Sequence, residues 1–202
     1  MASAIEGGFE YIATQMNPDG GIRWVDDASS VATTLRAVWA LAAGGYSQDY
    51  LQHETGDRPI DFLANHGADW IDQTDFDTPG FNVARAGQLL TAIAAANQNP
   101  HRFSDNSRDF IYEIRTLYDP NTGVFGNSTP ENVLDQVWAI IGLAANNASI
   151  PTEAVDWLSS AQLPDGSWIL TVATPIEDVL LFFHPFSSGL KIFIVSLILM
   201  VV

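Results

Sequence analysis

The sequence predicts an all-α protein built from repeated helical hairpins, and two observations indicate this fold class. First, a short pattern recurs in which an aromatic and an aliphatic residue are followed by a glutamine and then by a turn that contains glycine. The turn glycines are Gly20, Gly80, Gly123 and Gly166, which lie 60, 43 and 43 residues apart. Second, an alanine-rich apolar segment follows each of the first three turns. Self-similarity at this spacing is typical of repeat architectures.

The fourth copy of the pattern is the most complete. Its residues are Trp157, Leu158, Gln162, Asp165, Gly166 and Trp168. The first copy keeps Gln15 and Gly20, the third keeps Gly123, and the second is degraded. An Asp or Asn shortly before a turn glycine stabilises the turn through its side chain, and glycine accepts the positive φ that such turns require.

Two kinds of predicted helix alternate along the chain. The helices that follow the turns, at residues 31–43, 84–96 and 133–145, are apolar or small around most of their circumference. This pattern indicates helices buried on nearly all sides. The helices that precede the turns are amphipathic, and the one at 152–162 directs Trp157 and Leu158 toward the core and Glu153 outward. We therefore expect hairpins packed side by side, with the apolar helices inside.

Turn and capping residues support these helix ends. The segment Ser128 to Glu131 combines the spacing of a capping box with a proline in the first turn, just before the helix at 133. The pairs Gly44-Gly45 and Asn146-Asn147 follow two of the apolar helices, where a left-handed residue commonly ends a helix. The longer first interval contains a polar, turn-rich insertion at residues 46–58.

The fourth copy resembles the QW motif of the squalene-hopene cyclase and prenyltransferase repeat superfamily at every fixed position, and the other copies match in part. The resemblance covers about residues 5–168, as repeats at about 5–45, 59–99, 108–147 and 152–168 onward. It implies an α/α toroid, in which inner and outer helices alternate around a cavity, here a partial ring of about four repeats. In this superfamily the motif's Gln and Trp are regarded as ties between repeats. Its members include cyclases, prenyltransferase β subunits, thioester-containing domains and surface-protein modules, so the motif indicates no single activity.

The composition excludes several classes of function. Eight basic residues against 24 acidic ones give a net charge of −16. Such a chain repels phosphate backbones, so nucleic acid is not an expected partner. The absence of cysteine excludes disulfides and thiol chemistry. No secretion signal is visible in the first 30 residues. An acidic, lysine-poor composition suits a halotolerant cytosolic protein, but we favour an extracellular or cell-surface one.

The C-terminal segment, residues 169–202, departs from the repeat pattern. It ends in an apolar run at 192–202, in which Ser196 is the only polar residue. This run is shorter than the roughly 20 residues that span a bilayer. Three interpretations stay open: an element that closes the core, the start of a membrane anchor, or a segment unrelated to the repeats. We expect membrane or detergent contact through 192–202.

Two acids between the first turn and the first apolar helix are the candidate catalytic residues. Asp26 and Asp27 resemble the last two acids of the cyclase Asp-x-Asp-Asp motif, while Trp24 replaces the first. The resemblance implies Asp26 as proton donor and Asp27 as its supporting carboxylate. The alternative, which we favour, is that Asp27, Ser29 or Ser30 caps the helix from Val31, with Asp27 near its first amides.

No metal site or cofactor is expected. A prenyltransferase-type zinc site requires a cysteine, which the chain lacks, and the four histidines show no ligand spacing. These are His53, His66, His101 and His184. The acids Asp72, Asp75 and Asp77 lack the glycine and glutamate of a calcium-binding loop, so a solvated loop is expected.

Aromatic residues are the candidate ligand contacts. Trp39 and Trp138 occupy equivalent places on two apolar helices, and Trp24 and Phe81 follow turns. Their rings suit an apolar or saccharide ligand, although structural packing is the alternative for the periodic positions. We expect a non-catalytic repeat module that presents a groove to a ligand or protein partner. The alternative is a fragment of a class II terpene cyclase, an isomerase.

Overall fold

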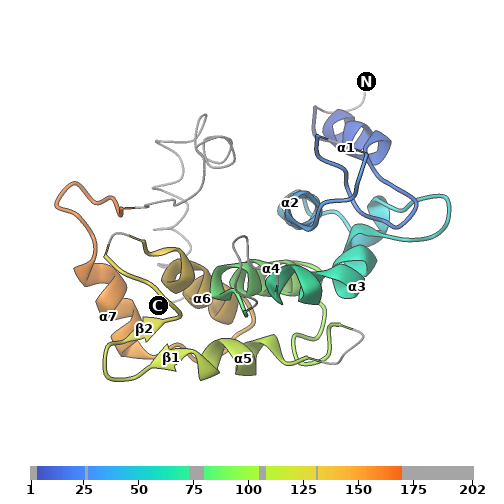
Figure 1. The fold of residues 1–202 in the computed structure, drawn as a ribbon. Helices are drawn as coiled ribbons and strands as arrows, with labels where there is room; N and C mark the ends of the chain where they lie inside the picture. Colours follow the sequence, from blue (N-terminus) through green and yellow to red (C-terminus); the bar gives the residue numbers. More distant parts are fainter. Residues whose placement is uncertain (1–3, 26, 73–79, 105–107, 131, 170–202) are drawn as a thin grey trace.

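The computed structural model describes residues 4–25, 27–72, 80–104, 108–130 and 132–169 (Figure 1). This part of the chain is mostly helical, as predicted, and adds one 3-10 helix and one two-stranded hairpin. In chain order the elements are α1 (Ala4–Thr14), α2 (Val31–Ala43), η1 (Gln48–Tyr50), α3 (Pro59–Asp72), α4 (Val83–Ala95), α5 (Phe110–Thr116), β1 (Tyr118–Asp119), β2 (Val124–Phe125), α6 (Leu134–Ala145) and α7 (Thr152–Ser160). The three predicted apolar helices are α2, α4 and α6, each found within one residue of its expected bounds.

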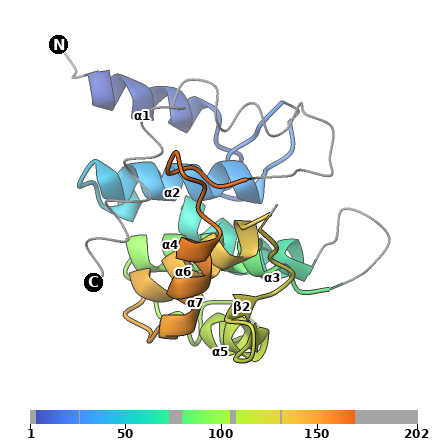
Figure 2. The same cartoon turned by 90° about the vertical axis from the view of Figure 1, so that its left-hand side faces the viewer.

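The three apolar helices pack side by side, with α4 between α2 and α6 (Figures 1 and 2). The amphipathic helices flank them: α3 packs against α2 and α4, α5 against α4, and α7 against α6. Helix α2 contributes Leu35 and Val38 to the main core and Ala37 and Leu41 to a smaller core beneath α1. Its burial on two sides explains why apolar residues surround it.

Two glycines set the tight contact between α4 and α6. A Cβ atom on Gly142 of α6 would lie 2.7 Å from the carbonyl oxygen of Gly87 on α4. A Cβ atom on Gly87 would overlap the backbone carbonyl of Trp138. The two backbones therefore meet directly, without intervening side chains.

The apolar helices all end in the same way. Gly45, Asn97 and Asn147 each lie two residues beyond a helix end and adopt positive φ angles of 73°, 53° and 54°. The next residue in each case donates its amide to a carbonyl five positions back, at 2.9 Å. This is the Schellman arrangement. The structure confirms the predicted ends at Gly45 and Asn147, and it adds Asn97.

Two of the turn glycines also contact the next amphipathic helix in equivalent ways. Gly20 and Gly123 have φ angles of 81° and 75°, as turns of this kind require. A Cβ atom on Gly20 would lie 2.5 Å from the Arg58 carbonyl oxygen, just before α3. One on Gly123 would lie 2.6 Å from the Glu153 carbonyl oxygen, in the first turn of α7. Each turn therefore packs directly against the backbone at the start of the next amphipathic helix, α3 or α7.

A buried polar side chain near the start of an apolar helix forms hydrogen bonds with each of these glycine turns. In α6, the buried Gln136 amide accepts from the Phe125 amide at 2.8 Å and donates to the carbonyls of Gly123 and Ala154 at 3.0 and 2.7 Å. In α2, the buried Thr34 hydroxyl accepts from the Ile22 amide at 2.9 Å. Ile22 and Phe125 both lie two residues after the turn glycine, so the two ties are equivalent.

The start of α6 differs from the prediction. The helix begins at Leu134, and Val133 before it makes no side-chain capping bond. Instead, the Ser128 hydroxyl accepts from the Gln136 amide at 2.8 Å, from eight residues earlier in the chain. The Asp135 carboxylate accepts from the amides of Ala84 and Asn127, which joins α6 to the start of α4. Burial raises the pKa of Asp135, and these two amides oppose the rise.

The insertion at 46–58 is fixed to the start of α3 by one arginine. Arg58 pairs with Asp61 at 2.8 Å and with Asp49 at 2.7 Å. The hydrogen bonds from Arg58 lower the pKa of Asp61. Pro59 occupies the first helical position, where its missing N–H costs no hydrogen bond.

The apolar run at 192–202 and most of the C-terminal segment lie outside the described residues. Among the helices that are described, none is long and apolar enough to cross a membrane.

Candidate functional site

A pocket of about 590 Å³ lies between the loop that leads into α2 and helix α3. The loop contributes Asp19, Trp24, Ala28, Ser29 and Ser30, α2 contributes its first residue, Val31, and α3 contributes Phe62, His66, Asp69 and Trp70. The lining therefore combines two indoles, two carboxylates, one imidazole and two hydroxyl groups. This mixture of aromatic surface and a few polar groups is typical of small-molecule sites.

Short-range hydrogen bonds hold the loop wall of the pocket. Asp19 Oδ1 accepts from the Gly21 amide at 3.0 Å and from the Ser29 hydroxyl at 2.7 Å. The Asn17 side chain donates to the Ser29 hydroxyl and to the Asp27 carbonyl, each at 2.9 Å. A Cβ atom on Gly21 would overlap the Ser29 side chain, so the two arms of the loop are in direct contact. Contacts within the protein therefore fix the conformation of this wall without a ligand.

Each of the two pocket indoles lies under a guanidinium group. The Arg36 guanidinium is 5.8 Å from the centre of the Trp24 ring, and the Arg85 guanidinium is 5.2 Å from the centre of the Trp70 ring. Arg85 also donates to the Trp70 carbonyl at 2.9 Å. Burial lowers the pKa of Arg36. Trp24 is still 50% exposed, so much of its surface is available to a ligand.

Of the two candidate catalytic acids, the structure describes only Asp27, which does not lie in an enclosed cavity. The Asp27 side chain is fully exposed and pairs with Arg23 at 3.6 Å. The prediction that Asp27 lies at the first amides of α2 is wrong, because the Ser30 hydroxyl accepts from the Thr33 amide and caps that helix. Ser30 was one of the predicted caps. Asp26 lies outside the described residues.

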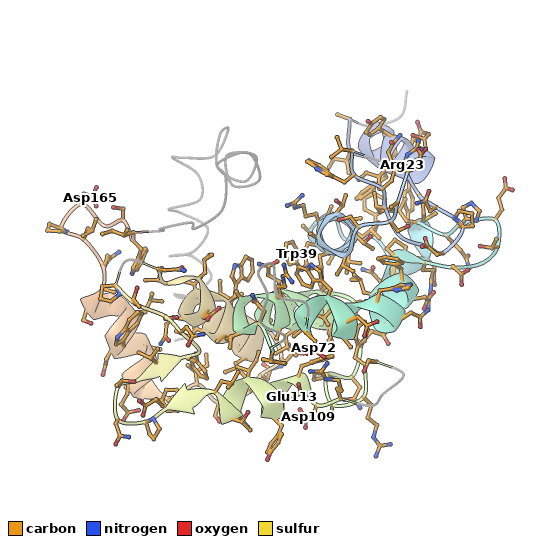
Figure 3. All side chains as sticks on the ribbon, in the orientation of Figure 1. Arg23, Trp39, Asp72, Asp109, Glu113 and Asp165 are labelled. Atoms are coloured by element: carbon orange, nitrogen blue, oxygen red, sulfur yellow. The ribbon has the colours of Figure 1, made fainter. Side chains whose placement is uncertain are left out.

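The four aromatic residues predicted to bind a ligand do not form one site. Trp24 lines the pocket. Trp39, which Figure 3 labels, stacks on Trp138 with ring centres 5.8 Å apart and planes at 12°, and this contact joins α2 to α6. Phe81 packs against the main core beneath the Arg108 guanidinium.

Four residues of α3 that line the pocket were not predicted: Phe62, His66, Asp69 and Trp70. Their spacing of three and four residues places them on one face of a helix, which is visible in the sequence. Nothing in the sequence shows that this face meets the loop of the first repeat.

The other residues of the recurring pattern form hydrogen bonds or pack against the core. Trp168 Nε1 donates to the Leu158 carbonyl at 2.8 Å, and Gln162 Nε2 donates to the Gly166 carbonyl at 2.9 Å. Both bonds stay inside the fourth copy. Asp165 supports its turn by accepting from the Ser167 amide at 2.9 Å, and Trp157 packs against the core. In the first copy, Gln15 accepts from Arg23 Nε at 3.1 Å.

These positions predict unequal effects of truncation. We expect Trp168→Ala to lower the free energy of unfolding by about 1–3 kcal/mol, less than a fully buried tryptophan would cost, because Trp168 is half-buried. We expect Gln162→Ala to stay within about 0.5 kcal/mol, because its side chain is exposed. Urea denaturation of both variants measures this. Equal losses of stability in the two variants would contradict the half-buried position of Trp168 and the exposed position of Gln162.

Two of the described histidines and Asp72 have polar partners within the protein. His101 pairs with Asp109 at 2.7 Å, and His53 contacts Thr55 within a turn. Asp72 pairs with Arg108 at 2.7 Å. Across the described ranges, no group of three potential ligands is arranged to hold a metal ion. His184, Asp75 and Asp77 lie outside those ranges.

Comparison with models of protein families, with curated proteins and with solved structures finds no match to this chain.

Proposed function

We propose that this chain is a non-catalytic helical-repeat module, similar in plan to the squalene-cyclase and prenyltransferase repeats, which binds a small ligand in the pocket between the loop that leads into α2 and helix α3. The observation that carries the proposal is the pocket lining, where Trp24 and Trp70 meet Asp69 and His66 in a hollow of about 590 Å³. Aromatic surfaces that converge with a few polar groups on a preformed hollow favour ligand binding.

The repeat plan is supported by equivalences that do not depend on the QW pattern. The apolar helices end in the same hydrogen-bonded motif, and Gly20 and Gly123 dock in the same way on the hairpins that follow them. We propose that these hairpins form part of an α/α toroid, with α2, α4 and α6 on its inner side. Each turn then positions the loop after it, which in the first repeat is the wall of the pocket.

The alternative of a class II terpene cyclase receives less support. An acid that protonates an alkene needs a site without water and a neighbouring group that tunes its pKa. Asp27, the proposed supporting carboxylate, is fully exposed. Trp24 stands where the motif requires the first acid, and it lines the pocket instead.

Two measurements on the full chain test the proposal. Glucose, choline and farnesol are titrated separately while the indole N–H resonances are followed by heteronuclear NMR. We expect at least one probe to shift the Trp24 and Trp70 resonances while that of Trp138 stays in place, since Trp138 lies on α6 outside the pocket lining. Failure of all three probes would contradict ligand binding here.

The second measurement is incubation with squalene or geranylgeranyl diphosphate, followed by mass spectrometry of the products. We expect both substrates to be recovered unchanged. A cyclised product that disappears in the Asp26→Asn variant would overturn the non-catalytic account.

A further inference from the structure

The charge of the pocket narrows the ligand class, an inference that rests on the proposed function. The lining includes Asp19 and Asp69 but no lysine or arginine. The whole chain carries a net charge of −16. An opening lined by one sign of charge concentrates ions of the opposite sign and repels ions of its own sign. An anionic ligand is therefore disfavoured at this place.

The two carboxylates have oxygen atoms that no other described group uses. The Asp69 side chain is exposed, and no hydrogen bond or ion pair from the described residues reaches it. Asp19 makes both of its hydrogen bonds through Oδ1, which leaves Oδ2 without a partner in the described ranges. Arg36 and Arg85 are not part of the lining.

The indole rings provide a second attraction for positive charge. The face of an indole attracts a cation through its quadrupole, most strongly among the aromatic side chains. The protein's own Arg36 and Arg85 lie over Trp24 and Trp70 in this way. Each ring has a second face, and both rings line the pocket. A ligand that combines positive charge with apolar surface matches both the rings and the carboxylates.

We propose that this pocket binds a small organic cation, with an ammonium group held between Asp69 and the indoles of Trp24 and Trp70. Asp19 Oδ2 adds a second negative charge on the loop side. The volume of about 590 Å³ accommodates a group larger than a bare ammonium ion, so apolar substituents on the nitrogen contact the rings and Phe62. Neutral sugars use the same rings, but they do not benefit from the unpaired carboxylate charge.

The test compares choline with its neutral isostere 3,3-dimethylbutan-1-ol, which has the same shape without the charge. Binding to the full chain is followed by the Trp24 and Trp70 indole resonances. We expect choline to bind roughly tenfold or more tightly, because only the cation interacts with the carboxylate and the ring quadrupoles. We also expect choline binding to weaken as salt is raised from about 10 to 150 mM. Equal affinity for the isostere would overturn the inference.

Variants assign the effect to the pocket. We expect Asp69→Asn and Trp24→Ala each to weaken choline binding by roughly tenfold or more. Both side chains are exposed, so circular dichroism should remain that of the native protein. The matched control, Asp156→Asn, removes the same charge from the exposed face of α7 and should leave binding unchanged. If Asp69→Asn and Asp156→Asn lost the same choline affinity, the effect would come from the net charge of the protein, and the proposed site would be wrong.

The outcome is distinguishable from failure of the proposed function. If glucose or farnesol shifts the Trp24 and Trp70 resonances and choline does not, the pocket binds a ligand but the cation assignment is wrong. If no probe shifts either resonance, both proposals fail.

Discussion

The Gly87→Ala substitution is expected to lower the free energy of unfolding by about 3 kcal/mol or more, although alanine is the better helix former. In an open helix this exchange gains up to about 1 kcal/mol. At Gly87 the new methyl group would overlap the Trp138 carbonyl, which is backbone and cannot rotate away. Separation of α4 from α6 would loosen contacts along both helices, so the loss lies at the upper end of overpacking costs. Urea denaturation midpoints measure it.

Helix α1 provides the matched control. Gly7 and Gly8 also lie inside a helix, but a Cβ atom there would meet nothing within 4 Å. We expect Gly7→Ala to stabilise the protein by about 0.5–1 kcal/mol. If Gly87→Ala stabilised the protein as Gly7→Ala does, the close contact of α4 with α6 would be contradicted.

The Gln136→Leu substitution is expected to cost about 3–6 kcal/mol while nearly preserving side-chain volume. The Gln136 amide is the partner of three buried backbone groups, those of Phe125, Gly123 and Ala154. Each group left without a partner costs about 1–3 kcal/mol. Gly123 belongs to the third glycine turn, Phe125 to β2 and Ala154 to α7. The amides of this turn should therefore lose protection from hydrogen exchange before those of the rest of the fold.

Gln162→Leu makes the same chemical change at an exposed position with one local hydrogen bond. We expect its denaturation midpoint to stay near that of the native chain. If both variants lost the same stability, Gln136 would not be the tie between the third turn and α7.

The QW resemblance directs attention to Gln162 and Trp168, whereas Gln136 makes the buried inter-element contacts. The sequence contains no local signal for this role. Gln136 lies in a helix whose other buried residues are Ala, Ile, Leu and Gly, where one glutamine resembles a solvent-facing position. Its function depends on a turn that precedes it and a helix that follows it.

The candidate site was predictable in one part only. Trp24 was expected near a ligand because it follows a turn, and it lines the pocket. The pocket's other wall comes from α3, about forty residues later in the chain, through His66, Asp69 and Trp70. The expected role of Asp27 as a cap failed for a local reason: Ser30 is adjacent to the helix, so its short side chain reaches the Thr33 amide directly.

The sequence by itself determined the mostly helical class, the bounds of α2, α4 and α6 within one residue, the positive φ at Gly20 and Gly123, and the helix ends at Gly45 and Asn147. These features depend on hydrogen bonds and backbone conformations within a few residues, which residue type controls directly. Only the tertiary structure decided that Gly87 faces Gly142, that Gln136 joins a turn to α7, and that α3 completes the pocket beside Trp24. Those contacts join residues far apart in the chain, and periodicity indicates which face of a helix is buried without indicating what it is buried against.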